Sequence, residues 1–215
     1  MRLIVAVLAV ATVLPVSPSL AQSDRWTVRG RAMAVVADDD SETVADTGTA
    51  IAVDSSFGAE IGVTYLVLPQ WGLELSAWYA PLDLSTVGGD AAGLDVGSVD
   101  LLSATLSVQY RFRTESRFDP YVGVGIALAQ LGGYAATSDM VAAGIADITF
   151  SNIFRLFTQF GTDVEIGKGW LLNVDLRYMP MTTQMDFITA AGASLDKTAL
   201  DLNPFLISLG IGRSF

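Results

Sequence analysis

The chain has 215 residues, of which 51% are hydrophobic and 16% charged, and its formal net charge is −11. An acidic chain is a poor match for nucleic acid, which needs a basic surface, and the absence of cysteine excludes a disulfide framework and thiol chemistry. After the first 21 residues no apolar run approaches the ~20 residues that a membrane-spanning helix needs, so we also exclude a helical membrane protein.

The N-terminal segment has the features of a secretory signal peptide. Arg2 supplies a positive charge, residues 3–14 are apolar, and Ser19-Leu20-Ala21 forms a small-x-small cleavage site. We therefore expect residues 1–21 to be removed and residues 22–215 to form one domain.

Eight segments of that domain alternate apolar with small or polar residues, at the period of two that is typical of strands. Each is about as long as a tilted membrane-crossing strand, which has ~9–11 residues. In chain order they are 26–36, 57–68, 72–80, 102–112, 121–131, 156–166, 171–179 and 205–215. The pattern predicts an all-β fold, an eight-stranded antiparallel transmembrane β-barrel.

The connections between these segments alternate between short and long. Long connections cover 37–56, 81–99, 132–155 and 180–199, whereas the others are short. Short periplasmic turns and long extracellular loops are typical of outer-membrane barrels. The alternative is a soluble, lipocalin-like cup. Such a cup would bury its apolar residues inside the barrel, and it does not easily explain the charged residues on the opposite face of the strands.

Aromatic residues gather at the strand ends beside the short turns, as in a girdle at head-group depth. They could instead be core aromatics next to turns. The set is Trp26, Trp71, Tyr110, Phe112, Phe118, Tyr121, Trp170 and Phe215.

Charged residues on the inward face concentrate in the periplasmic half of the predicted barrel. Isolated buried charges are costly, and eight strands enclose a space that side chains largely fill. We therefore predict an interlocked ionic plug, with a water-filled charged pore as the alternative. Its members are Arg29, Arg31, Glu74, Arg111, Asp163, Glu165, Asp175 and Arg177.

The upper lumen is predicted to be apolar. A hydrophobic vestibule above a charged floor would suit an apolar solute that enters from outside and leaves sideways into the bilayer. The same residues could simply pack the loops onto the barrel. They are Trp78, Leu101, Phe157, Met179 and Met181.

The long connections are acidic, and they include the run Asp38-Asp39-Asp40. Its spacing matches no EF-hand loop, so we expect solvated loops, bridged to lipid phosphates by divalent cations, in preference to a dedicated calcium site. No cofactor and no resident metal are predicted.

Several segments together resemble the OmpW family of small outer-membrane proteins. They are Val53-Asp54-Ser55, Gly62-Val63-Thr64-Tyr65, 120–125, 161–163, 169–178 and 203–215. The resemblance implies a barrel in the outer membrane of a Gram-negative bacterium, with a hydrophobic lumen. It also implies uptake of small hydrophobic molecules and release through a gap in the wall; the related alkane-importer branch looks similar. Arg213 departs from the family pattern, which usually places an aromatic residue there.

We consider three functions for the predicted barrel. The first is a narrow channel for small hydrophobic molecules, and the second is a structural, adhesive or stress-response surface barrel without transport. The third, a lipid-modifying enzyme, lacks its usual general base, because the chain contains no histidine. The expected partners are outer-membrane lipids and lipopolysaccharide, small hydrophobic solutes, and the barrel assembly machinery through the terminal Phe215.

Overall fold

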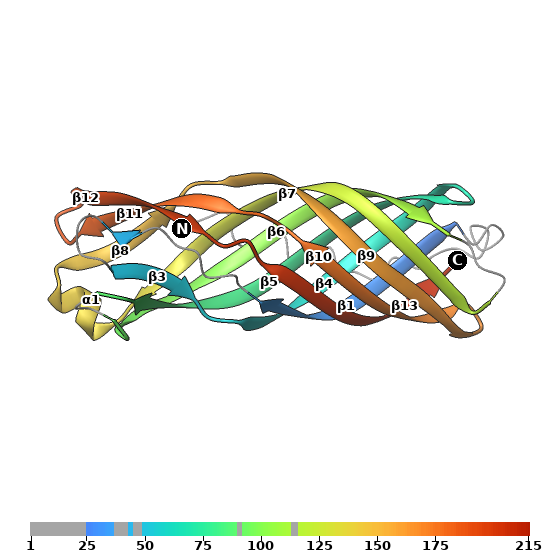
Figure 1. Ribbon diagram of the computed structural model, residues 1–215, viewed down its shortest axis with the longest axis horizontal. Helices are drawn as coiled ribbons and strands as arrows, with labels where there is room; N and C mark the ends of the chain where they lie inside the picture. The colour runs from blue at the N-terminus through green and yellow to red at the C-terminus, as the bar shows by residue number, and fades with distance from the viewer. Residues whose placement is uncertain (1–24, 37–42, 45–48, 90–91, 113–115) are drawn as a thin grey trace.

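A closed antiparallel barrel of eight strands forms the body of the molecule (Figure 1), which confirms the predicted fold class. The computed structural model describes residues 25–36, 43–44, 49–89, 92–112 and 116–215; the predicted signal peptide lies outside these and stays a prediction. The barrel strands are β1 (Trp26–Val36), β4 (Ser56–Leu68), β5 (Trp71–Val87), β6 (Asp95–Arg111), β7 (Phe118–Ala136), β9 (Ile153–Gly167), β10 (Trp170–Tyr178) and β13 (Phe205–Ser214).

The barrel closes where its first and last strands pair. β1 and β13 run antiparallel from Thr27 opposite Ser214 to Val36 opposite Phe205. Two backbone hydrogen bonds between Trp26 and Phe215 finish the seam at the periplasmic end. The terminal aromatic residue is therefore part of the closure.

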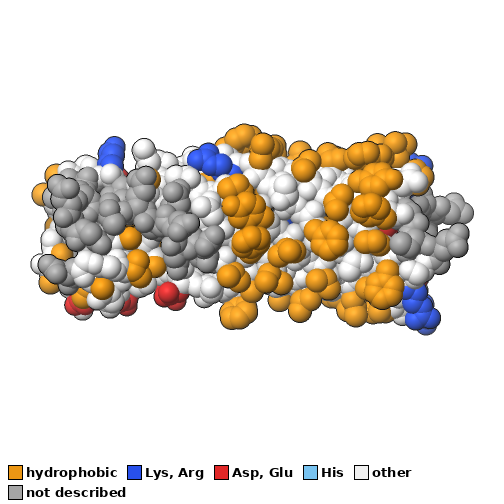
Figure 2. Space-filling view, in the orientation of Figure 1, with side chains coloured by type: hydrophobic (Ala, Val, Ile, Leu, Met, Phe, Trp, Pro, Cys, Tyr) orange, Lys and Arg blue, Asp and Glu red, His pale blue; other side chains and the backbone are white. Residues whose placement is uncertain are grey.

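The side chains divide between the faces as the period of two predicts. Leu75, Val124 and Leu209 are 60–63% exposed on the outer surface, whereas Glu74 and Ser208 on neighbouring inward positions are buried. Figure 2 shows the outward hydrophobic side chains gathered in a belt across one half of the face in view. This belt is the surface that faces acyl chains, because its burial in lipid removes apolar area from water.

Aromatic rings line the periplasmic edge of the belt. Trp26 packs against Tyr65, with ring centroids 4.6 Å apart, and Trp71 packs against Tyr110 at 5.2 Å. Arg213 faces outward here, and its guanidinium lies 5.5 Å from the Trp170 ring and 5.3 Å from the Phe215 ring. The cation at the position that departs from the family pattern is thus held between aromatic faces at the interface, where a charge costs little.

The central strands extend well past the membrane. β5 and β6 have 17 residues each and β7 has 19, against the ~9–11 needed to cross. The long connections, predicted as loops, also contain strands and a short helix: β2 (Thr43–Val44), β3 (Thr49–Val53), α1 (Ser138–Ala142), β8 (Ile145–Phe150), β11 (Thr182–Thr189) and β12 (Ser194–Asp201). β8, β11 and β12 form a separate three-stranded sheet at the extracellular end. No helix in the described part of the chain is long and apolar enough to span a membrane.

Candidate functional site: a charged floor beneath an apolar layer

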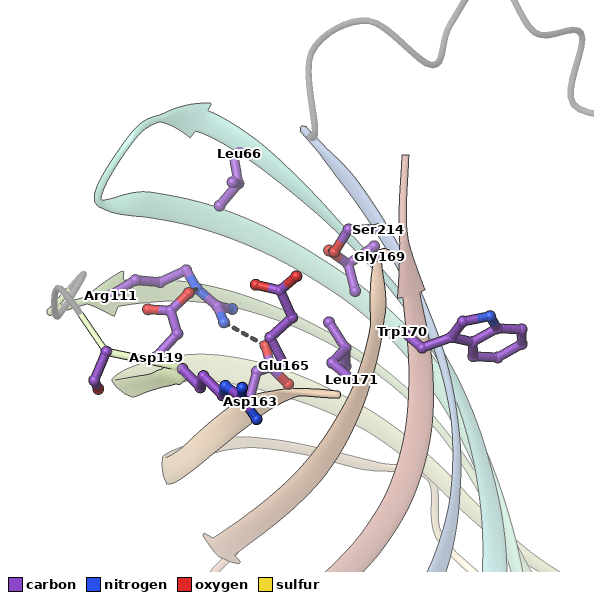
Figure 3. Close-up of a pocket in the computed structure, with 12 residues that line it drawn as sticks. Leu66, Arg111, Asp119, Asp163, Glu165, Gly169, Trp170, Leu171 and Ser214 are labelled. Atoms are coloured by element: carbon purple, nitrogen blue, oxygen red, sulfur yellow. Dashed lines mark hydrogen bonds and ion pairs between the residues drawn. The ribbon is translucent and has the colours of Figure 1, made fainter. Parts of the chain in front are cut away.

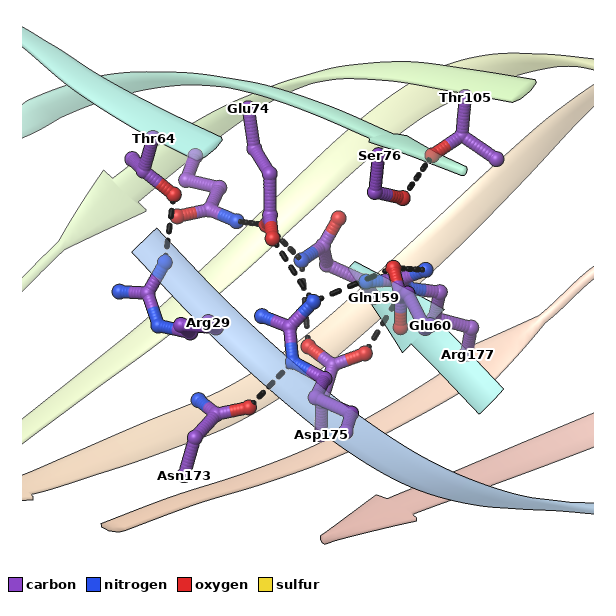
Figure 4. Close-up of polar contacts among 12 residues, drawn as sticks. Arg29, Glu60, Thr64, Glu74, Ser76, Thr105, Gln159, Asn173, Asp175 and Arg177 are labelled. Atoms are coloured by element: carbon purple, nitrogen blue, oxygen red, sulfur yellow. Dashed lines mark hydrogen bonds and ion pairs between the residues drawn. The ribbon is translucent and has the colours of Figure 1, made fainter. Parts of the chain in front are cut away.

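The lower lumen holds a network of buried charges, here called the ionic floor. All of its side chains are nearly inaccessible to solvent, and several of the polar contacts are drawn in Figure 4. Its members are Arg29, Arg31, Glu60, Glu74, Arg111, Asp163, Asp175 and Arg177.

The periplasmic part of the floor is centred on one carboxylate. Asp163 accepts from Arg29, whose Nε lies 3.0 Å from Oδ1, and also from Arg111. Arg111 turns its Nε to Asp119 Oδ2 at 2.9 Å. The amide of Asn173 donates to Asp163 Oδ1 at 2.8 Å. Two arginines and an amide thus compensate the desolvation of a single acid.

The upper part of the floor is a chain of alternating charges. Arg31 Nη1 lies 2.8 Å from Glu74 Oε1 and 3.2 Å from Glu60 Oε1. Arg177 Nη1 lies 2.7 Å from the same Glu60 oxygen, and its Nε lies 2.8 Å from Asp175 Oδ1. The chain of charges begins at Glu74 on β5 and ends at Asp175 on β10, which lie opposite each other in the strand order of the barrel, so it crosses the lumen.

Neutral polar groups complete the floor. Tyr121 is fully buried in the lumen, so its predicted place in the aromatic girdle is wrong; its hydroxyl donates to Asp175 Oδ2 at 2.7 Å, and Gln159 Nε2 donates to the same atom at 3.2 Å. Gln109 donates to Glu74. With four arginines and four acids in the set, the floor is balanced in charge and cross-linked across the lumen. This arrangement favours the plug over the water-filled pore.

Two acids differ from their predicted places. Glu165 is exposed on the periplasmic rim, where it lines a cavity of about 300 Å³ with Arg117 and Ser116 (Figure 3), so it is not part of the buried network. The alternation still holds at Glu165, which lines this cavity together with Asp163 and Arg111, but solvent reaches it at the open periplasmic mouth of the barrel. Glu60, which shares the inward face of its strand, was missing from the predicted plug and joins both Arg31 and Arg177.

Above the floor lies a packed apolar layer. The predicted vestibule residues all belong to it, and none is more than 2% exposed: Trp78, Leu101, Phe157, Met179 and Met181, joined by Met33, Met185 and Leu206. The Phe157 ring rests on the floor, with its centroid 5.8 Å from the Arg177 guanidinium carbon. The described side chains fill this layer and also pack the extracellular sheet onto the barrel.

The contacts described for these residues are ion pairs, hydrogen bonds and apolar packing. Among the residues that the structure describes, no group of three or more His, Cys, Asp or Glu could hold a metal ion. The acidic run at 38–40 lies outside the described residues.

An apolar belt, an aromatic edge and a charged lumen define an outer-membrane β-barrel protein of a Gram-negative bacterium. The chain belongs to the OmpW family, whose profile matches residues 22–215, and this confirms the resemblance inferred from the sequence.

Individual relatives cover nearly the whole chain. Outer membrane protein W of Vibrio cholerae is 29% identical over 212 residues, which span 97% of each chain. The dibenzothiophene metabolism operon protein PahQ of Pseudomonas aeruginosa is 23% identical over 204 residues, covering 93% of this chain and 92% of PahQ. The crystal structure of OprG from Pseudomonas aeruginosa has the same fold, with a TM-score of 0.76, 24% identity and coverage of 88% of this chain and 95% of OprG.

Proposed function

We propose that the protein is a passive outer-membrane channel for small hydrophobic molecules, which it releases sideways into the bilayer. The observation that supports this most directly is the sharp change in the lumen from an apolar layer to a crosslinked charged floor. The name of the relative PahQ points the same way, since dibenzothiophene is an apolar aromatic compound.

The floor sets the direction of movement. An apolar solute that continued toward the periplasm would have to separate ion pairs in a space where they cannot be rehydrated, and this is strongly unfavourable. The acyl chains outside the barrel are a better solvent for the same solute than the charged floor is. Lateral release therefore needs no energy source.

The apolar layer must rearrange to admit a solute, because it is packed. Met33, Met179, Met181 and Met185 supply the means, since all four are buried and methionine has an unbranched, flexible and polarisable side chain. We expect entry to proceed by rotation of these side chains and not by movement of the hydrogen-bonded barrel.

Leu101→Asp tests the pathway. The side chain is 1% exposed within the apolar layer, so an unpaired carboxylate there attracts water and repels an apolar solute. We expect uptake of a hydrophobic fluorescent probe to fall roughly tenfold, which corresponds to ~1.4 kcal/mol, while the folded barrel persists.

The matched control is Leu94→Asp, because Leu94 is 42% exposed outside the barrel strands. Uptake by this variant should equal that of the parent chain. Equal uptake by both aspartate variants would count against a route through the apolar layer.

A surface-binding barrel without transport is the second candidate. The observation that favours it is the extracellular sheet of β8, β11 and β12, which presents a folded surface beyond the membrane. Deletion and complemented cells should be compared for probe uptake and for adhesion to surfaces. A phenotype in adhesion alone would favour this candidate over the channel.

The terminal strand and the outer leaflet suggest two further partners. We propose that Phe215, at the end of the closing strand, is read by the barrel assembly machinery, and that lipopolysaccharide surrounds the upper edge of the belt. The hydrogen bonds between Phe215 and Trp26 support the first assignment, because the terminal residue takes part in the seam that closes the barrel.

A further inference from the structure

Arg213 is a cation on the lipid-facing side of the closing strand, at the periplasmic edge of the belt. In the register it lies opposite Val28 of β1 and Trp170 of β10. It is exposed, and it shares its outward face with Ile211 and Leu209, which are 49% and 62% exposed. A long cationic side chain at this depth reaches the head groups while its stem lies against apolar surface.

The described acids do not neutralise this cation. Each of the four arginines of the ionic floor pairs with a carboxylate, whereas Arg213 forms no ion pair or hydrogen bond with the residues that the structure describes. Asp119 and Glu165, the acids near this end, line the cavity at the mouth of the lumen. The anion that complements Arg213 must therefore come from outside the chain.

Two aromatic rings hold the guanidinium in place. Its carbon lies over the Trp170 ring at 5.5 Å and over the Phe215 ring at 5.3 Å. Contacts of this kind engage the flat face of a guanidinium, whereas its five N–H donors point outward in the plane of the group. Those donors match the two oxygens of a phosphate in a bidentate contact. We call Arg213, Trp170 and Phe215 the headgroup clamp.

Two further cations lie at the same end of the barrel. Arg25, next to Trp26, and Lys168, in the turn between β9 and β10, are both exposed. The turn adjoins the closing strand, since Ser214 N donates to Gly169 O at 2.8 Å. Lys168 has a φ of 55°, in the left-handed region that favours glycine, so a cation is present where glycine would be less strained. Figure 2 shows Lys and Arg side chains beside the periplasmic edge of the belt.

This concentration of positive charge contrasts with the chain as a whole, whose formal net charge is −11. An anionic head group gains about 1 kcal/mol for each nearby Lys or Arg at a membrane surface. The periplasmic end of the closing strand is therefore complementary in charge to anionic lipid.

An apolar strip continues from the clamp into the bilayer along the same two strands. Leu172 lies opposite Ile211 and Val174 lies opposite Leu209, and all four are 44–62% exposed on the outer face. Ile211 is two residues from Arg213, which is about 7 Å along a strand. The acyl chains of a lipid whose phosphate contacts Arg213 would thus lie along this strip.

We propose that the headgroup clamp and the apolar strip form a binding site for an anionic phospholipid of the inner leaflet. Arg213 holds the phosphodiester through its in-plane donors, Trp170 and Phe215 keep the guanidinium in position, and Lys168 and Arg25 add attraction for a net negative head group. The site lies on the outside of the barrel, so it does not depend on transport through the lumen.

Competition between two lipids tests the site. The purified protein in neutral detergent is mixed with equal amounts of phosphatidylglycerol and phosphatidylcholine that carry the same acyl chains, and native mass spectrometry gives the ratio of bound lipids. The parent protein should retain phosphatidylglycerol at least fivefold better, because choline places a cation next to the phosphate. Arg213→Gln should lower this ratio roughly fivefold, which corresponds to ~1 kcal/mol.

Two variants separate the fork and the rings from the charge alone. Arg213→Lys keeps a cation but loses the planar group with its bidentate donors. Trp170→Leu keeps the guanidinium but removes one of its two rings. Both should give ratios between those of the parent and Arg213→Gln.

The matched control is Lys197→Gln, which removes an exposed cation from β12 at the extracellular end. Its lipid ratio should equal that of the parent. Heat-modifiable electrophoretic mobility shows in each case that the barrel is folded, so a lost preference cannot be confused with a lost structure.

Excess glycerol 3-phosphate distinguishes a lipid site from a site for soluble phosphates. It carries the phosphate but no acyl chain, so it should leave the bound phosphatidylglycerol in place. Displacement at millimolar concentration would overturn the assignment to lipid.

Three other results would contradict the proposal. Equal retention of the two lipids by the parent protein would overturn the site. An unchanged ratio in Arg213→Gln would overturn the role of the clamp. An equal loss in Lys197→Gln would mean that net charge, and not this place on the barrel, selects the lipid.

Discussion

Arg177→Leu is expected to lower the free energy of unfolding of the barrel by about 3–5 kcal/mol, the usual cost of breaking a buried ion pair from one side. Arg177 is 1% exposed and bridges Glu60 and Asp175 across the lumen. Its loss leaves Asp175 with only the neutral donors Tyr121 and Gln159. Urea titration in phospholipid vesicles, followed by tryptophan fluorescence, measures the change.

Two companion variants show whether the charge or the packing is responsible. Arg177→Leu with Asp175→Asn removes both charges of the pair while the amide oxygen can still accept from Tyr121, so it should recover part of the loss. Arg25→Leu, at an exposed position, should leave the unfolding midpoint unchanged. An unaltered midpoint for Arg177→Leu would contradict the structural role of the floor.

The sequence predicts the membrane-crossing part of each strand because the apolar side chains there all lie on the outer face, and the polar or small ones on the inner face. Along β5, Leu73 and Leu75 face outward, and Glu74 and Ser76 face inward. This pattern needs no tertiary information, because a residue's parity decides whether it meets lipid or lumen. The start of β1 and the end of β4 were accordingly predicted to the residue.

The sequence does not predict the extracellular extension of these strands, because the apolar side chains change there from the outer to the inner face of the barrel. Beyond Ala80, the polar residue Asp83 faces outward, whereas Leu82 and Leu84 face inward and are buried. The period of two continues across this point, but water replaces lipid outside the barrel, so the apolar face changes sides. The prediction treated this inversion as the end of a strand.

The lumen contacts could be predicted only as a set, not as pairs. Parity places Glu60 and Glu165 equally inward, but Glu60 is buried between Arg31 and Arg177, whereas Glu165 lines the cavity at the open periplasmic mouth. Arg155 shows the same limit, since its parity is inward and its side chain is outside. Contacts between distant strands depend on how the strands of the barrel tilt.

The alternation also does not show where a small residue lies beside a large inward-facing residue of the neighbouring strand. Arg31 on β1 faces Gly210 on β13, and Arg29 faces Gly212. A Cβ on Gly212 would lie 2.8 Å from Arg29 Cγ, so the arginine stem occupies the space that a side chain would need. In a lumen this narrow, the ionic floor fits only because glycines on the adjacent strand make room for it.

Gly210→Val is expected to destabilise the barrel by at least about 3 kcal/mol, at the upper end of the usual cost of overpacking. A Cβ at this position would lie 2.4 Å from Gly30 O and 2.6 Å from Arg31 Cγ. The backbone carbonyl cannot move away without opening the β1–β13 seam, and the displaced Arg31 would lose Glu74 and Glu60. Heat-modifiable mobility and urea titration in vesicles should both report the loss.

Gly30→Val provides the control on the same seam, since Gly30 faces lipid and a Cβ there meets nothing within 4 Å. Because glycine in a strand interior costs ~0.5–1 kcal/mol relative to alanine, this variant should be neutral or slightly more stable than the parent chain. The two substitutions add the same side chain on adjacent strands of one seam, so a difference between them isolates the lumen as the cause. Equal stability of the two variants would mean that the arginine stems do not depend on the glycines that face them.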